Sequence, residues 1–168
     1  ALRQDKVVVY NGFDATGPSL HVGSLVPIMG LLHLQRYGHS PLALVGGGTS
    51  MIGDPSGKSK ERVLLSVDEI EANAASIREQ LSRFLDFDAK ANPARLINNT
   101  DWLLKLNLVD FLRDTGKHFT VNYMLAKESV KRRLGGDEGI SFTEFSYLLL
   151  QAHDYLVLHD RFGCTLQA

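Results

Sequence analysis

Three polar side chains with the spacing of one helix face lie near the C-terminal end of the sequence. Tyr147, Gln151 and Asp154 stand at positions i, i+4 and i+7 of a segment whose other residues are mostly Leu, Phe and Tyr. This spacing places a phenol, an amide and a carboxyl group side by side, where they could bind the polar groups of a small ligand. A water-exposed helix face has the same pattern, and because His153 and Tyr155 are also polar or amphipathic, both interpretations stay open.

A second candidate group begins another segment of helical periodicity. His21, Gly23 and Ser24 follow the turn-forming pair Pro18 and Ser19. Free amides and the positive dipole end make the start of a helix suitable for a phosphate, and glycine lets a flat ring approach the backbone. His21 could instead simply cap the helix.

The stretch GDPSGKS, residues 53–59, is similar to a phosphate-binding P-loop. A P-loop requires four residues between its glycines, whereas three separate the glycines here, and no predicted strand runs directly into it. We therefore do not predict a P-loop. Lys58, Lys60 and Arg62 could still contact phosphate or form an ordinary solvated surface, and Asp54 could be a simple turn residue.

These groups must be positioned by alternating strands and helices. Apolar periodicity and turn signals predict strands at 6–10, 41–45, 95–98 and 164–167, and helices at 20–37, 67–85, 102–116, 121–134 and 141–163. Ser141 and Glu144 have the spacing of a capping box at the start of the last helix. The alternation predicts an α/β domain with a parallel sheet, whose ligand lies beyond the carboxyl ends of the strands. The loops 12–19 and 46–58 fall at that edge.

Composition is typical of one globular domain covering residues 1–168. Hydrophobic residues make up 44%, charged residues 22%, and the net charge is −1. No overall field attracts nucleic acid or an acidic membrane, so any RNA contact must be local. Cys164 is the single cysteine, which excludes an internal disulfide and fits a reducing compartment, so we expect a cytoplasmic protein. We find no membrane-spanning run or signal pattern, and we expect the chain to be a fragment.

Four stretches together resemble the catalytic domain of bacterial-type tyrosyl-tRNA synthetases over nearly the whole chain. They are GFDATGPSLHVGSL, LVGGGTSMIGDPSGKSKER, FLRDTGKHFTVNYMLAKESV and GISFTEFSYLLLQAHDY. The resemblance implies a Rossmann-like class I synthetase fold with helices on both faces of the sheet and a helical insertion at roughly 100–140. It also implies activation of L-tyrosine by ATP, with Mg²⁺ bound to the ATP rather than held by the protein, and transfer of tyrosine to tRNA(Tyr).

The resemblance assigns two sets of residues. The implied catalytic residues are His21, Thr16 and Ser24, of which His21 and Thr16 would donate to the phosphates while Ser24 would lie along the adenosine half of ATP. Ser24 replaces the second histidine usual in the family, so we expect altered ATP contact rather than loss of function. The full set of implied ATP-binding residues is Asn11, Gly12, Asp14, Thr16, His21, Gly23 and Ser24. The implied tyrosine-binding residues are Tyr10 and Asp154 at the phenol, Asp54, Tyr147 and Gln151 at the ammonium group, and Thr49 and Asn99 close by.

Further expectations concern the whole enzyme. Members of the family are homodimers joined through the helical insertion, which makes Phe111, Phe119 and Phe142 candidate interface residues. The Gly-Gly-Ser-Asp-Gln loop, the lysine-rich loop and the tRNA-binding region of the family do not follow Gln167, so we expect incomplete activity and poor tRNA binding from this chain. The alternatives are a tryptophanyl-tRNA synthetase, a small nucleotidyltransferase, and a catalytically idle relative that binds RNA.

Overall fold

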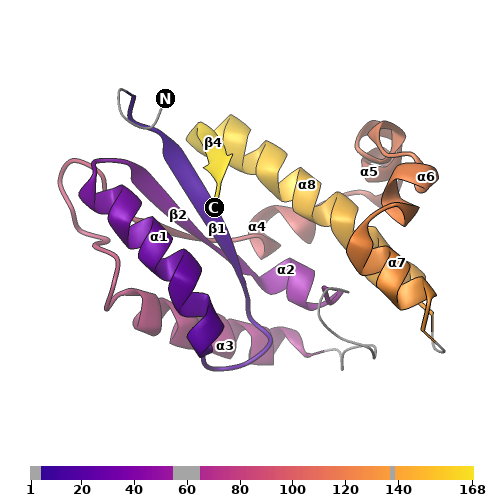
Figure 1. The fold of residues 1–168 in the computed structure, drawn as a ribbon, viewed down its shortest axis with the longest axis horizontal. Coiled ribbons are helices and arrows are strands. Elements are labelled where there is room, and N and C mark those ends of the chain that lie inside the picture. Colours follow the sequence, from indigo (N-terminus) through magenta and orange to yellow (C-terminus); the bar gives the residue numbers. More distant parts are fainter. Residues whose placement is uncertain (1–4, 55–64, 137–138) are drawn as a thin grey trace.

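The computed structural model describes residues 5–54, 65–136 and 139–168. Within them lies a parallel four-stranded sheet in the order β3-β2-β1-β4 (Figure 1). The strands are β1 (Val8–Asp14), β2 (Ser40–Gly46), β3 (Arg95–Asn98) and β4 (Cys164–Gln167). β1 pairs with β2 from Val8 opposite Ser40 to Asp14 opposite Gly46. The carboxyl ends of the two central strands therefore meet at one edge, as predicted.

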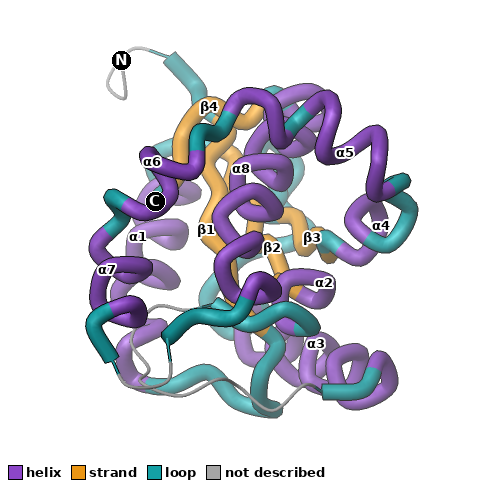
Figure 2. Tube along the Cα trace, turned by 90° about the vertical axis from the view of Figure 1, so that its right-hand side faces the viewer, coloured by secondary structure: helices purple, strands orange, loops and turns teal. Residues whose placement is uncertain are grey.

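Helices cover both faces of the sheet, which confirms the predicted α/β class (Figures 1 and 2). Successive side chains of a strand point to opposite faces. Val9 and Phe13 of β1 pack in the core formed with α1 (Leu25–Arg36) and α3 (Val67–Leu81). Tyr10 packs in the opposite core with Trp102 of α4 (Thr100–Leu103) and Leu158 of α8 (Phe142–Phe162).

The first strand and the first helix differ from their predicted bounds. β1 starts at Val8 and runs on to Asp14, because parallel pairing with β2 continues through Gly12. The predicted helix at 20–37 begins instead with a 3₁₀ turn, η1 (Val22–Ser24), and α1 starts only at Leu25. His21 is the N-cap of this 3₁₀ turn rather than part of an α-helical first turn. The glycine run after β2 was predicted as loop, but Gly47 begins a single helical turn, α2 (Gly47–Ser50).

Two predicted helices are each split in the structure. The segment 102–116 holds the end of α4, all of α5 (Leu108–Asp114) and the start of the 3₁₀ turn η2 (Gly116–His118), and 121–134 contains α6 (Val121–Leu125) and α7 (Glu128–Leu134). Asn107 has an extended backbone and its side chain accepts from Val109 N and Asp110 N, so it starts a new helix. Lys127 is extended in the same way before α7. α3 ends at Leu81 rather than 85, because the chain turns there.

The last helix and strand match their predicted positions. Ser141 Oγ accepts from the backbone of Glu144 at 3.3 Å, and Gly163, in the left-handed conformation at φ 64°, ends α8. The capping box is only half formed, because the Glu144 carboxylate bonds Arg133 of α7 at 2.7 Å instead, in a buried ion pair. In the described part of the chain, no helix has the length and apolar character required to cross a membrane.

Candidate active site

A cavity of about 220 Å³ opens at the carboxyl ends of β1 and β2, against α8. The polar residues lining it include Tyr10, Asn11, Asp14, Thr49, Asp54, Tyr147, Gln151, Asp154 and Gln167. All three members of the helical stripe thus line one cavity under the sheet edge. Asp154 is 2% exposed. The interpretation of the stripe as a water-exposed helix face is therefore wrong for Asp154, whereas Tyr147 is half-buried and Gln151 is exposed although both line the cavity.

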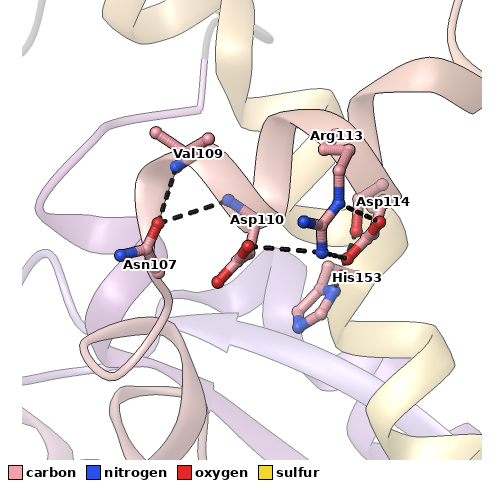
Figure 3. Close-up of polar contacts among 7 residues, drawn as sticks. Asn107, Val109, Asp110, Arg113, Asp114 and His153 are labelled. Carbon is pink, nitrogen blue, oxygen red and sulfur yellow. Dashed lines mark hydrogen bonds and ion pairs between the residues drawn. The ribbon is translucent and has the colours of Figure 1, made fainter.

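Neither neighbour of Asp154 on α8, His153 or Tyr155, lines this cavity. The ring of His153 lies beside α5, as Figure 3 shows, with Nδ1 3.4 Å from Thr115 Oγ1 and an edge-to-face contact with Phe111. Burial, with the nearby charge of Arg161, lowers the pKa of His153. The ring of Tyr155 instead packs against Tyr10. The successive residues His153, Asp154 and Tyr155 therefore contact three different parts of the molecule.

Two hydrogen-bond donors hold the buried carboxylate of Asp154. Asn99 Nδ2 donates to Oδ2 at 2.9 Å, and Trp102 Nε1 donates to Oδ1 at 2.7 Å. Burial raises the pKa of Asp154 to about 6, against the opposing effect of these two hydrogen bonds. Each carboxylate oxygen keeps acceptor capacity for one further donor.

Asn99 acts behind the cavity wall rather than in it. It is fully buried, its Oδ1 accepts from Gly48 N at 2.7 Å, and its Nδ2 also donates to Thr49 Oγ1 at 3.1 Å. Asn99 therefore connects the glycine turn after β2 to Asp154. Sequence reasoning expected Asn99 near the ligand and missed Trp102, whose indole was assigned only to an apolar helical pattern.

The hydroxyl of Tyr10 is the second polar group at the closed end of the cavity. It is buried, and within the described ranges it has no hydrogen-bond partner. Burial raises the pKa of Tyr10, and the negative charge of Asp154 adds to the effect, so the hydroxyl keeps its proton. A buried hydroxyl without a partner is unfavourable unless a ligand supplies one. The two groups together fit a ligand hydroxyl that can donate and accept.

Gly46 permits the close approach of two polar side chains at the cavity floor. A Cβ atom on Gly46 would lie 2.6 Å from Asp14 Oδ1 and 2.5 Å from Thr49 Oγ1. Any larger residue would displace one of the two. The glycine therefore brings the ends of β1 and α2 together.

A second cavity, of about 400 Å³, adjoins the first along residues 11–14 of β1. Its lining includes every residue predicted to bind ATP: Asn11, Gly12, Asp14, Thr16, His21, Gly23 and Ser24. The structure therefore places the two predicted sets at adjacent cavities that share residues 11–14 of β1. Their roles toward a ligand remain predictions.

His21 has a defined orientation at the mouth of this second cavity. Its Nδ1 accepts from Gly23 N at 3.1 Å, so the expected capping role is confirmed, at the 3₁₀ turn. In the neutral ring, an accepting Nδ1 places the proton on Nε2. His21 is exposed, and Nε2–H is left as the donor available to a ligand. A capping role and a phosphate role are therefore compatible.

The basic residues Lys58, Lys60 and Arg62 lie outside the described residues. In the part of the chain that is described, no group of three or more His, Cys, Asp or Glu side chains could hold a metal ion.

Comparison with known proteins places these cavities in a family context. The family described as "tRNA synthetases class I (W and Y)" matches residues 2–167. Tyrosine–tRNA ligases of Roseiflexus castenholzii and Opitutus terrae are 56% and 57% identical over 99% of the chain. The chain spans only 39% of the length of either relative.

Solved structures agree at the level of the fold. A C-terminally truncated mitochondrial tyrosyl-tRNA synthetase of Aspergillus nidulans superposes with a TM-score of 0.87 at 34% identity, over 98% of this chain and 48% of that one. An Archaeoglobus fulgidus tyrosyl-tRNA synthetase complexed with L-tyrosine gives a TM-score of 0.67 at 18% identity, over 96% of this chain and 45% of that one. The second likeness concerns the fold alone.

Proposed function

The chain belongs to the class I tRNA synthetases of the tryptophan and tyrosine group, and we propose that it forms the amino-acid-activating part of a tyrosine–tRNA ligase. In this reaction L-tyrosine and ATP give tyrosyl-adenylate, and tyrosine then passes to tRNA(Tyr). The relatives at 56% and 57% identity are named as tyrosine–tRNA ligases, which favours tyrosine over tryptophan. The observation that carries the proposal is the buried pair of Tyr10 and Asp154 at the closed end of the first cavity.

The tyrosine phenol would donate to Asp154 and accept from Tyr10. The Tyr10 hydroxyl has no partner in the described residues, and Asp154 has acceptor capacity left beside its two donors. Phenylalanine would leave both groups without a ligand partner in a buried site, which is costly. An indole offers one donor and no acceptor, so it could satisfy Asp154 but not a donating Tyr10.

The ammonium group of tyrosine would lie at the polar side chains that line the outer part of the first cavity, Asp54, Tyr147 and Gln151, with Thr49 nearby. A carboxylate together with phenolic and amide oxygens provides the acceptors that an ammonium group requires. This orientation would direct the tyrosine carboxylate toward the strand segment that the two cavities share. Asn99 would act indirectly, through its bonds to Asp154 and Thr49.

ATP would occupy the second cavity, with its adenosine half along Asn11, Gly12, Asp14, Gly23 and Ser24. His21 and Thr16 would donate to the phosphates, since the Nε2–H of His21 is the free donor of the ring. The tyrosine carboxylate would then attack the α-phosphate and release pyrophosphate. No side-chain nucleophile is required, because orientation and donors aimed at the developing charge lower the barrier. Mg²⁺ would arrive with ATP.

The proposal includes a homodimer in the cytoplasm. Exposed apolar side chains on α5 and at the start of α8 support an interface in the helical region, with Phe142 79% and Val109 69% exposed. Phe111 and Phe119 are half-buried, so Phe142 is the stronger interface candidate. Light scattering would test this, with Phe142→Ser expected to shift the chain toward a monomer and Val67→Ser, an exposed apolar residue on α3, as the control.

Calorimetry with tyrosine, phenylalanine, tryptophan and ATP tests the proposed function directly. We expect tyrosine to bind at least tenfold more tightly than phenylalanine, and Asp154→Asn to reduce that ratio by about tenfold, the scale of one hydrogen bond to a charged group. Binding of tryptophan in place of tyrosine would favour a tryptophanyl enzyme. Binding of neither amino acid nor ATP would favour an idle relative that binds RNA.

A further inference from the structure

We propose that Asn73 and Gln80 of α3 are positioning residues for the loop 15–20, and that their side-chain amides set the affinity of the second cavity for the phosphates of ATP. Neither residue lines either of the two cavities described above. The inference rests on the proposed function, in which Thr16 within this loop and His21 directly after it contact the nucleotide.

The two amides bind main-chain atoms at both ends of the loop. Asn73 Nδ2 donates to Ala15 O at 2.9 Å. Gln80 Nε2 donates to Pro18 O at 3.0 Å, and Gln80 Oε1 accepts from Leu20 N at 3.0 Å. Residues seven positions apart lie on one face of a helix, two turns from each other. One face of α3 therefore spans the loop from its first residue to its last.

A fourth hydrogen bond fixes the start of the loop from another element. Ala15 N donates to Ser50 Oγ of α2 at 2.9 Å, so both backbone groups of Ala15 are bound by side chains. The hydroxyl of Ser19 lies 3.3 Å from Gln80 Oε1 as well. The loop backbone is thus held at three residues, while the exposed side chain of Thr16 is left to face the cavity.

α3 is a firm support for these contacts. Ser66 and Glu69 form a complete capping box at its N-terminus. Ile70, Ile77 and Leu81 are fully buried in the core that contains Val9 and Phe13 of β1. Asn73 and Gln80 each follow a buried isoleucine by three positions, so burial of the apolar face fixes where the amides point.

Holding the loop in place favours ligand binding because the chain does not have to become ordered when ATP arrives. Fixing loop residues opposes binding through lost conformational entropy, and a loop ordered in advance avoids that loss. His21 follows Leu20 directly, so the bond from Leu20 N to Gln80 also determines where the imidazole begins. The amides of α3 therefore act on ATP through the loop, without touching it.

The test is Gln80→Met, which keeps the length of the side chain but removes its hydrogen bonds to Pro18, Ser19 and Leu20. A second variant, Gln80→Glu, keeps the acceptor for Leu20 N. The exposed neighbour Glu79→Gln is the matched control. Calorimetry would give the dissociation constants of ATP and tyrosine. Amide hydrogen exchange of residues 15–24 would report the order of the loop without any ligand.

We expect Gln80→Met to weaken ATP binding about tenfold, to change tyrosine binding less than twofold, and to speed exchange at Leu20. The ATP affinity and the exchange rate of Gln80→Glu should lie between those of Gln80→Met and the wild type, and Glu79→Gln should match the wild type in both. The inference would be overturned, and the proposed function left standing, if Leu20 exchanged in Gln80→Met at the wild-type rate, or if it exchanged faster while ATP affinity stayed unchanged. Failure of the wild-type chain to bind ATP would overturn the proposed nucleotide site and the inference with it.

Discussion

The two cavities on either side of residues 11–14 are held in different ways. Around Asp154, buried side chains bond one another, and the carboxylate is 2% exposed. Around His21, side chains from α2 and α3 bond the backbone of a largely exposed loop. A buried network with a charge at its centre suits selection of one polar group, because every mismatch leaves a buried group unpaired. A loop held by its backbone suits phosphates, which need donors at defined positions.

The largest expected effect comes from breaking the buried side of this comparison with Asn99→Ala. The change removes the acceptor for Gly48 N and one of the two donors to Asp154, all of them buried. We expect a loss of about 3 kcal/mol in the free energy of unfolding, because a buried amide and a buried charge lose partners. Denaturant unfolding would measure it.

The matched control for Asn99 is Asn107→Ala. Asn107 also accepts from backbone amides, those of Val109 and Asp110, but at an exposed helix start (Figure 3). Its loss should cost about 1 kcal/mol, as is usual for a helix cap. Equal losses for the two variants would show that burial does not distinguish the two sites.

Ser50→Ala tests the loop 15–20, and it should lower the free energy of unfolding by less than Asn99→Ala does. It leaves Ala15 N buried and without its hydroxyl acceptor, at a cost of about 1 to 2 kcal/mol. ATP affinity should fall, whereas tyrosine affinity should change less than twofold, and calorimetry with each ligand would show this. Ser76→Ala, which removes a hydroxyl bonded to the carbonyl of the preceding helix turn on α3, serves as the control. A larger loss of tyrosine affinity than of ATP affinity would contradict the division between the two cavities.

Tyrosine affinity at the first cavity should depend on pH through Asp154. The pKa of Asp154 is raised to about 6 by burial, and only the ionised form can accept from a phenol while both present donors stay bonded. Tyrosine affinity should therefore be full above about pH 7 and fall by up to about tenfold per pH unit below about 6. The contribution of Asp154 to the free energy of unfolding should depend on pH in the opposite sense to tyrosine affinity. Because the pKa of Asp154 is raised in the fold, the folded chain binds this proton more tightly than the unfolded chain, so the group stabilises the fold at low pH. This contribution is lost as the pH rises through about 6.

Asp154→Asn provides the control for the pH experiment. Because the amide does not titrate, tyrosine affinity in this variant should be lower and nearly flat between about pH 5 and 7. A wild-type affinity that stays constant over the same range would show that Asp154 is not the group that accepts from the ligand.

The smallest expected effect is that of Ser24→His, which introduces the second histidine usual in the family. Ser24 precedes α1 and makes no capping bond through its side chain to a described residue. Stability should therefore change by less than about 0.5 kcal/mol, as for other surface substitutions. We expect ATP affinity to change by less than about tenfold, the scale of one hydrogen bond, with unchanged tyrosine affinity. The exposed position Val26→Ala on α1 is the control.

Local pattern predicted the four strands, the final helix, the polar stripe on that helix and the candidate phosphate-binding turn at His21, whereas the other site residues came from the resemblance to the synthetase family. Strand 95–98 matches β3, and the spacing of Tyr147, Gln151 and Asp154 correctly placed three side chains on one face. Contacts between segments far apart in the chain have no such signature. Gln80 lies 60 residues from Leu20, and Trp102 lies 52 residues from Asp154.

The remaining errors concern where elements begin and end. Apolar periodicity continues through Asn107 and Lys127, although the backbone at both residues is extended and divides the helices. Pairing with β2 carried β1 past Gly12, against the turn preference of its sequence. In each case capping or sheet pairing outweighed the propensity of the individual residues.

Residues 11–14 form a common wall between the two cavities. A bisubstrate molecule that joins a phenolic amino acid to adenosine through a stable phosphate mimic would fill both sites. It would lose translational and rotational entropy once, whereas two separate ligands lose it twice. We expect such a compound to bind far more tightly than either half alone. Because the wall is shared, we also expect a substitution at any of these four positions to change the affinities for the amino acid and for the nucleotide together. Evolution at this strand therefore cannot alter one of the two affinities without the other.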